Sequence, residues 1–309
     1  WTYGEFVQKI RRLASVLSAK GIEPGDRAAL MLLNQKEFLL GFYALRFIGA
    51  VPVPINIQMP VDDIRYVIMH AGCKLVITNE TFAPNFEGTP LPLLVTGQGE
   101  AKHPSLEDAM DHGDPGFESA YSHEPGQLHV LMYTSGTTGK PKGVMLSEEN
   151  LTSNIAGFDA RIQLTPDEQG LLALPLFHAY GLIIALYLLD VGGTMALVPN
   201  FAPKKIMETL VAHKITILPL VPTLFTVLLQ GLARAGIQTL PDLKYCISGG
   251  ASLPAELLKK VEQVLGVVLL EGYGLTETSP LISFQPLCGT PKTDSIGIPA
   301  PRTEVRLVN

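Results

Sequence analysis

The sequence contains few cysteines, and they are not placed for a disulfide framework. Cys73, Cys246 and Cys288 are an odd number, they lie far apart, and no Cys-x-x-Cys pair occurs. This pattern is typical of reduced thiols, so we expect a cytoplasmic protein without disulfides. No signal peptide is visible near the first residue, which agrees with this expectation.

The sequence also lacks an uninterrupted apolar segment of membrane-spanning length. The longest uncharged stretch, Ile215 to Ala233, is long enough to cross a bilayer. Pro219 and Pro222 interrupt it near its start, so it indicates a strand, a turn and then a helix. We therefore expect no transmembrane segment, while peripheral membrane contact stays open.

Charged residues are few, and acidic residues slightly outnumber basic ones. Charged residues make up 17% of the 309 residues and apolar residues 47%, which is typical of a globular chain with a large interior and one to two domains. The net charge of −6 at pH 7 argues against a general nucleic-acid binder.

Helix and strand patterns alternate along most of the chain. Thr2 and Glu5 fit a capping box, and the helix that follows is predicted to end at Gly21. Further helices are predicted over 35–47, 61–70, 105–110, 148–161, 180–189, 203–213, 222–235 and 254–265. Strands are predicted over 28–33, 51–54, 75–78, 171–174, 194–198, 216–218, 245–248 and 267–270.

Such alternation predicts an α/β fold with mainly parallel sheets flanked by helices. We expect two subdomains of similar build, residues 1–147 and 148–309. Thr303 to Val308 is predicted to be a strand that starts a third β subdomain. Because the chain begins at Trp1 and stops in this strand, we expect it to be a piece of a longer protein.

The stretch Tyr133 to Gly143 combines hydroxyl groups, glycines and two lysines. The residues with these groups are Thr134, Ser135, Gly136, Thr137, Thr138, Gly139, Lys140, Lys142 and Gly143. Hydroxyl, backbone N–H and ammonium groups together suit a polyphosphate. An apolar strand, Leu128 to Met132, precedes the loop, so we expect the loop at the carboxyl end of a buried strand.

Two other interpretations of this loop are weaker. The P-loop of kinases and ATPases needs glycines five apart, then Lys and Ser/Thr leading into a helix, whereas Pro141 stands here at the Ser/Thr position. A flexible linker of Gly, Ser and Thr seldom follows a buried strand.

Three more segments contain candidate residues of a functional site. Glu271 to Thr278 follows a predicted strand with an aromatic residue between two glycines, then Thr and Glu. Ser248 to Ala251 ends another predicted strand with small residues. Pro175 to Gly181 places a histidine among aromatic residues.

The loop and these segments, in this order, resemble the adenylate-forming superfamily, which includes acyl-CoA synthetases, luciferases and the adenylation domains of peptide synthetases. The resemblance covers nearly the whole chain and is nearest to the N-terminal large domain of acyl-CoA synthetases, such as long-chain fatty-acid–CoA ligases. It implies ATP, Mg²⁺ and coenzyme A as cofactors. It also implies a small C-terminal domain that is missing here.

The resemblance assigns roles residue by residue. It implies nucleotide contacts for Thr134, Ser135, Gly136, Thr137, Thr138, Gly139, Lys142, Gly249, Gly250, Ala251, Glu271, Gly272, Tyr273, Gly274 and Thr276. Tyr273 would stack on adenine and Thr276 would bind the α-phosphate. It implies catalytic roles for Lys140, His178, Thr276 and Glu277, and Mg²⁺ contacts for Thr134 and Glu277.

The acid substrate is implied by the segment around His178. Amino-acid-activating relatives usually carry Asp there, so the histidine argues against an amino-acid substrate. The substrate residues implied are Phe177, His178, Tyr180, Val221 and Phe225. A helix with Leu224, Phe225 and Leu228 could line a tunnel for a medium or long acyl chain, or could be plain core; His178 could likewise be a core histidine bonded to backbone.

The function implied is ATP-dependent activation of a carboxylic acid, with a fatty acid favoured, to an acyl-adenylate and then a coenzyme A thioester. Two alternatives stay open. A fatty acyl-AMP ligase would load a carrier protein, but such enzymes carry an insertion where only sixteen residues separate Glu277 from Asp294. A non-catalytic relative that binds nucleotide or acyl groups is the other.

Overall fold

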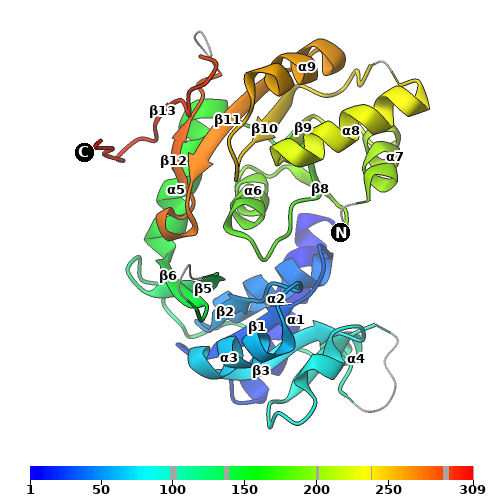
Figure 1. The fold of residues 1–309 in the computed structure, drawn as a ribbon. Helices are drawn as coiled ribbons and strands as arrows, with labels where there is room; N and C mark the ends of the chain where they lie inside the picture. Colours follow the sequence, from blue (N-terminus) through cyan, green and yellow to red (C-terminus); the bar gives the residue numbers. More distant parts are fainter. Residues whose placement is uncertain (98–102, 136–138, 200–201, 238, 288–291, 309) are drawn as a thin grey trace. The chain divides into compact units, whose positions relative to one another are not determined.

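The computed structural model describes residues 1–97, 103–135, 139–199, 202–237, 239–287 and 292–308. The chain divides into two compact units, Trp1–Glu149 (unit 1) and Asn150–Asn309 (unit 2). Both units are α/β, with helices packed on the faces of sheets (Figure 1).

Unit 1 is built on a four-stranded parallel sheet of order β2-β1-β3-β4. Its strands are β1 (Arg27–Met31), β2 (Val51–Pro54), β3 (Cys73–Asn79) and β4 (Leu93–Thr96). The helices are α1 (Tyr3–Ala19), α2 (Lys36–Phe47), α3 (Val61–Ala71) and α4 (Leu106–Asp111), with a 3₁₀ turn η1 (Ala83–Phe86). The expected capping box is confirmed, because Thr2 and Glu5 exchange hydrogen bonds at the start of α1.

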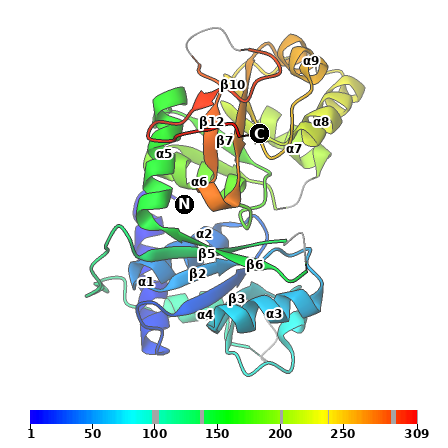
Figure 2. The same cartoon turned by 60° about the vertical axis from the view of Figure 1, so that its left-hand side comes forward.

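An antiparallel hairpin, β5 (Leu128–Thr134) and β6 (Lys142–Ser147), completes unit 1, with β5 beside β2 (Figure 2). The buried strand expected before the glycine-rich loop is therefore present, but its partner is antiparallel. Because β6 starts at Lys142, a strand follows the loop where a P-loop would need a helix.

Unit 2 contains a seven-stranded sheet of order β13-β12-β11-β10-β9-β7-β8. The strands are β7 (Gln169–Leu172), β8 (Thr194–Leu197), β9 (Ile217–Leu220), β10 (Tyr245–Ser248), β11 (Val268–Gly274), β12 (Leu281–Phe284) and β13 (Ile298–Pro299). From β8 to β11 the neighbours are parallel, whereas β12 and β13 add antiparallel edges. The sheet is therefore mixed rather than a copy of the sheet in unit 1.

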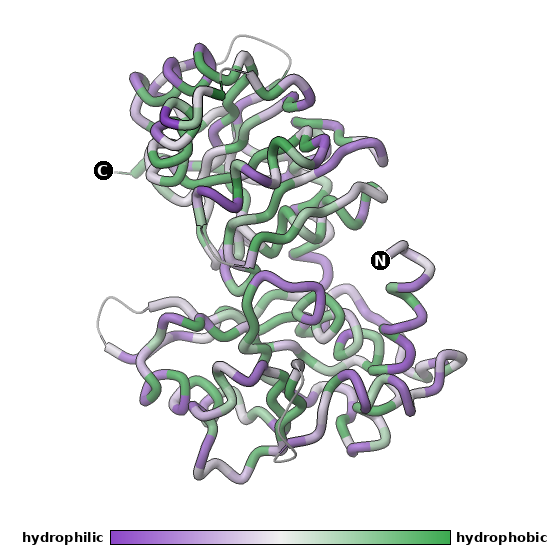
Figure 3. The backbone as a smooth tube through the Cα atoms, turned by 90° about the vertical axis from the view of Figure 1, so that its right-hand side faces the viewer, coloured by the Kyte–Doolittle hydropathy of each residue, from purple (hydrophilic) through white to green (hydrophobic). Residues whose placement is uncertain are grey.

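The helices of unit 2 supply much of its core. They are α5 (Glu148–Ile162), which begins at the boundary, α6 (Ala179–Asp190), α7 (Pro203–Ala212), α8 (Pro222–Ala235) and α9 (Ala255–Leu265), with a 3₁₀ turn η2 (Thr276–Thr278). Helix α6 is apolar on every side and nearly all of its residues are buried, as expected for a helix inside a core. Within each unit, hydrophilic segments lie mainly at the periphery (Figure 3).

The observed secondary structure differs from the prediction in two respects. Residues 303–308 form no strand, because the antiparallel edge of the sheet is made by β12 and the short β13 instead. The strands β4, β6, β12 and β13 were not expected; each is short and has Gly or Pro in it or beside it in the sequence, which hides the strand pattern.

Candidate functional site

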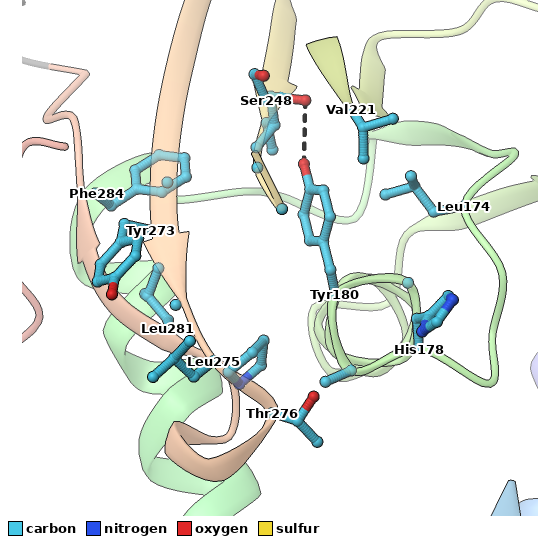
Figure 4. Close-up of a pocket in the computed structure, with 18 of the residues that line it drawn as sticks. Leu174, His178, Tyr180, Val221, Ser248, Tyr273, Leu275, Thr276, Leu281 and Phe284 are labelled. Carbon is cyan, nitrogen blue, oxygen red and sulfur yellow. Dashed lines mark hydrogen bonds between the residues drawn. The ribbon is translucent and has the colours of Figure 1, made fainter. Parts of the chain in front are cut away.

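Unit 2 contains a cavity of about 380 Å³ at the carboxyl ends of β9, β10 and β11 (Figure 4). This is the edge where ligands bind in parallel α/β sheets. Its apolar wall includes Phe158, Leu174, Leu281 and Phe284. Residues expected from the sequence that line it are His178, Tyr180, Val221, Gly249, Gly250, Gly272, Tyr273, Gly274 and Thr276.

Tyr180 in the first turn of α6 forms the floor between α6 and β10. Its hydroxyl donates a hydrogen bond to the Ile247 carbonyl at 3.1 Å, drawn as the dashed line in Figure 4. Burial raises the pKa of Tyr180, so the phenol stays neutral. A Cβ at Gly249 would lie 3.3 Å from the Tyr180 ring, so a larger residue there would require the ring to shift by a few tenths of an ångström.

The turn after β11 carries Tyr273, Thr276 and Glu277. Tyr273 is 41% exposed, and in Figure 4 its ring stands next to Phe284 at the cavity wall. Gly274 packs directly on the next strand, because a Cβ there would meet the Pro280 carbonyl oxygen at 1.8 Å. The side chain of Thr276 faces the cavity, whereas Glu277 is exposed.

Asn154 on α5, which sequence reasoning missed, holds this turn by hydrogen bonds to its backbone. Its amide nitrogen donates to the carbonyls of Thr278 at 3.2 Å and Leu281 at 3.1 Å, and its carbonyl accepts from the Leu281 N–H at 3.0 Å. Only 7% of Asn154 is exposed. A signal was available, because Asn154 lies on the apolar face of a helix between Leu151 and Phe158, where a buried amide needs partners.

His178 is the residue before α6 and stands at the rim of the cavity. Its backbone is extended (φ −97°, ψ 143°), and its ring lies 4.7 Å from the ring of Phe177. Part of the side chain reaches solvent, yet partial burial removes water from the ring. This desolvation disfavours the charged form and lowers the pKa of His178 below its ordinary value. At neutral pH the imidazole is therefore uncharged and can offer a hydrogen bond, but no full positive charge.

Besides Glu277, four residues of unit 2 that were expected at the site do not line the cavity. Phe225 is fully buried in the apolar core under α8, and Phe177 is also buried and does not line the cavity. The carboxylate of Glu271 accepts a hydrogen bond from the Leu253 N–H at 3.0 Å, away from the cavity. Ala251 is exposed beyond the β10 turn and is not part of the lining.

The glycine-rich loop belongs to unit 1 and connects β5 to β6. Gly136, Thr137 and Thr138 lie outside the described residues. Thr134 pairs with Lys142 at the base of the hairpin. Ser135, Gly139 and Lys140 are exposed, as is Lys142, and Gly139 has φ +138°, a conformation that favours glycine.

The donor set of the η2 turn suits Mg²⁺. Among the residues that the structure describes, no three His, Cys, Asp or Glu side chains gather as a metal cluster. Mg²⁺ usually takes one or two carboxylates and completes its shell with phosphate oxygens and water. On η2, the exposed side chain of Glu277 would supply one carboxylate to such an ion.

Comparison with known proteins identifies the family. The model of the AMP-binding enzyme family matches residues 1–309, so the chain belongs to this family. It is similar to feruloyl-CoA synthase of Amycolatopsis sp, with 33% identity over 99% of this chain and 60% of the relative. It is also similar to a long-chain-fatty-acid–CoA ligase of Bacillus subtilis, with 30% identity over 99% of this chain and 60% of the relative.

Solved structures agree with this assignment. ATP-bound MatB from Rhodopseudomonas palustris superposes with a TM-score of 0.86 at 31% identity, over 97% of this chain and 59% of that one. The chain thus spans about 60% of the length of the curated relatives it matches. No helix in the described part of the chain is long and apolar enough to cross a membrane.

Proposed function

We propose that the protein activates a carboxylic acid with ATP and transfers the acyl group to coenzyme A. The observation that carries this proposal is the cavity of unit 2, which joins an apolar wall to the polar turn of Tyr273 and Thr276. An apolar wall suits the body of an acid, and a flat aromatic ring beside small residues suits adenine. Family membership and the glycine-rich loop support the same chemistry.

In the first step a carboxylate oxygen attacks the α-phosphorus of ATP, the bond to the bridging oxygen breaks, and pyrophosphate leaves. We propose that the loop hydroxyls and Lys140 or Lys142 bind the phosphates, and that Thr276 donates to the α-phosphate. Mg²⁺ at Glu277 would neutralise phosphate charge. In the second step the thiol of coenzyme A attacks the acyl carbon and AMP leaves.

His178 would orient the acid. Because its pKa is lowered, the neutral ring would donate one hydrogen bond to the carboxylate rather than form an ion pair. Tyr180 cannot serve in the same way without giving up its bond to the Ile247 carbonyl. We therefore assign recognition of the carboxylate to His178, and the shape of the floor to Tyr180.

The acid itself is proposed to be apolar, and a fatty acid is the first candidate, supported by the similarity to a long-chain-fatty-acid–CoA ligase. A second candidate is an aryl-substituted acid such as the one named for the feruloyl-CoA synthase relative. Phe225 lies in the core of unit 2 rather than at the cavity, so it gives no support to a long-chain tunnel along α8.

We also propose a cytoplasmic location. Cys73 and Cys246 are free and buried thiols, and burial raises the pKa of Cys73 to about 12. Such thiols are structural and inert, as expected in a reducing compartment.

The test is a pyrophosphate-release screen on the complete protein, with fatty acids from short to long chain, cinnamic and benzoic acids, amino acids, ATP and Mg²⁺. We expect apolar acids alone to give turnover, followed by thioester when coenzyme A is added. In Glu277→Gln the rate should fall at least tenfold and recover in part with excess Mg²⁺. Nucleotide binding without release of pyrophosphate from any acid would contradict the enzyme and favour a non-catalytic relative.

A further inference from the structure

Helix α3 of unit 1 touches both ends of the glycine-rich loop. Tyr66 and His70 are one turn apart on this helix and share a face, with ring centroids 5.3 Å apart and planes 29° from parallel. Tyr133, just before the loop, shares a hydrogen bond of 2.7 Å between its hydroxyl and Nδ1 of His70. Lys140, just after the loop's central residues, places its Nζ 4.9 Å from the centre of the Tyr66 ring.

These contacts connect the two ends of the loop through Tyr133, His70, Tyr66 and Lys140 in turn. The His70 and Tyr133 rings meet edge to face at 5.8 Å, so the imidazole is held by both tyrosines. Burial raises the pKa of Tyr133 to about 12, so its hydroxyl keeps its proton for this hydrogen bond. Tyr66 and Tyr133 also pack against the apolar core of unit 1, which anchors the chain of contacts to the sheet.

We propose that Tyr66 is a positioning residue for Lys140, and that the Tyr66–His70–Tyr133 contacts hold Tyr133 and Lys140, at the two described ends of the glycine-rich loop, in place for phosphate binding by Lys140. This inference rests on the proposed function. Lys140 has an exposed side chain, and an unheld lysine must lose its rotamer freedom when it binds a phosphate. The electron-rich face of Tyr66 attracts the ammonium and restricts it before the nucleotide arrives.

The kinetic test uses the complete protein with Tyr66→Leu and Tyr66→Phe. We expect Tyr66→Leu to raise KM for ATP about two- to fivefold, the size expected of one exposed cation–π contact. The kcat and the KM for the acid should stay within error. Tyr66→Phe keeps the aromatic face and should restore the wild-type KM for ATP. Met69→Leu, on the same helix at an 81% exposed position, is the matched control and should change nothing.

A double-mutant cycle with Lys140→Met separates positioning from general loosening of the fold. In the Lys140→Met background, Tyr66→Leu should cause no further rise in KM for ATP. An equal rise in both backgrounds, a loss in Tyr66→Phe as large as in Tyr66→Leu, or an unchanged KM in Tyr66→Leu would each overturn the proposal.

Amine labelling of the nucleotide-free protein tests the contact without relying on activity. Lys142, also exposed and two residues away, is the internal reference for acetylation followed by mass spectrometry. We expect Lys140 to react more slowly than Lys142 in the wild type and in Tyr66→Phe, and equally fast in Tyr66→Leu. Equal rates in the wild type would overturn the contact itself, whatever the acid screen shows.

Discussion

At the scale of single residues, two glutamates of the same short motif have opposite surroundings. Glu271 lies inside β11, where burial raises the pKa of its carboxyl and the Leu253 N–H is its partner. Glu277 lies on η2 and is exposed. A carboxylate that binds a hydrated cation needs an exposed position like that of Glu277. At the buried position of Glu271, both the carboxylate and the cation would have to lose their water.

His178 gives a prediction about pH. Its folded pKa lies below the unfolded value near 6.5, so between these two values the unfolded chain binds more protons than the folded chain. This residue's contribution to stability is therefore present above about pH 6.5 and is lost as pH falls through the folded pKa. We expect wild type to lose more unfolding free energy than His178→Gln between pH 7 and pH 5.

Urea unfolding of both proteins at the two pH values measures this difference. The comparison within each protein removes any effect of the substitution on stability at neutral pH. Parallel losses in wild type and His178→Gln would show that the imidazole is solvated as fully in the folded as in the unfolded chain.

The sequence predicted several residues that line the cavity, but it did not predict where the lining ends and the core begins. His178, Tyr180 and Val221 were expected at the site and do line the cavity. Phe225 was expected as well, but it lies one turn beyond Val221 on the face of α8 that packs on the sheet. An apolar helix face has the same residue pattern whether it contacts a ligand or packs in a core. The sequence therefore could not tell whether Phe225 lines the cavity or belongs to the core.

At the scale of elements, α5 determines where the η2 turn lies. Asn154 links the helix to Thr278, the last residue of the turn, and to Leu281, the first residue of β12, by three hydrogen bonds to backbone groups. In Asn154→Ala the buried N–H and carbonyl of Leu281 and the carbonyl of Thr278 would lose their partners. We expect the free energy of unfolding to fall by at least about 2 kcal/mol, because each unpaired buried group costs about 1–3 kcal/mol.

Ser153→Ala is the matched control for Asn154→Ala. Ser153 is exposed on the same helix and bonds only within it, to the Asn150 carbonyl, so its loss should stay within about 0.5 kcal/mol. Urea titration followed by circular dichroism supplies both values. Equal effects of the two substitutions would mean that the turn holds its position without Asn154.

Long periodic elements were predicted closely, and short elements that depend on a partner were not. Helix α1 was recognisable from its capping box and its apolar spacing, and β2 was predicted with its observed bounds. The hairpin strand β6 forms by pairing with β5, and only three of its six residues, Val144, Met145 and Leu146, are apolar. The same dependence explains 303–308, where apolar residues alternate but no neighbouring strand pairs with them.

At the scale of the whole molecule, each unit has an apolar core of its own. The core of unit 1 includes Met31 and Phe86, and the core of unit 2 includes Phe225 and Cys246. A core within one unit stabilises that unit directly, so a cavity made in one should act first on the unit that contains it.

Trp1, the only tryptophan of the sequence, allows unit 1 to be observed alone. Its ring stacks on Phe6 and lies 5.0 Å from Nζ of Lys9 on α1 and 4.7 Å from Nζ of Lys36 on α2, so its fluorescence reports the packing of these helices. Phe225→Ala should remove about 3–5 kcal/mol from unit 2. We expect circular dichroism to show earlier unfolding in urea while the fluorescence midpoint stays at its wild-type value.

Phe42→Ala, which opens a cavity in the buried face of α2, is the reciprocal variant and should shift the fluorescence midpoint. If Phe225→Ala moved both signals together by the same urea increment, the two cores would unfold as one cooperative unit. Destabilising substitutions anywhere in the chain would then weaken the glycine-rich loop and the cavity alike. Separate midpoints would instead mean that the loop of unit 1 and the cavity of unit 2 respond to mutation independently, which the kinetic variants at Tyr66 and Glu277 can exploit.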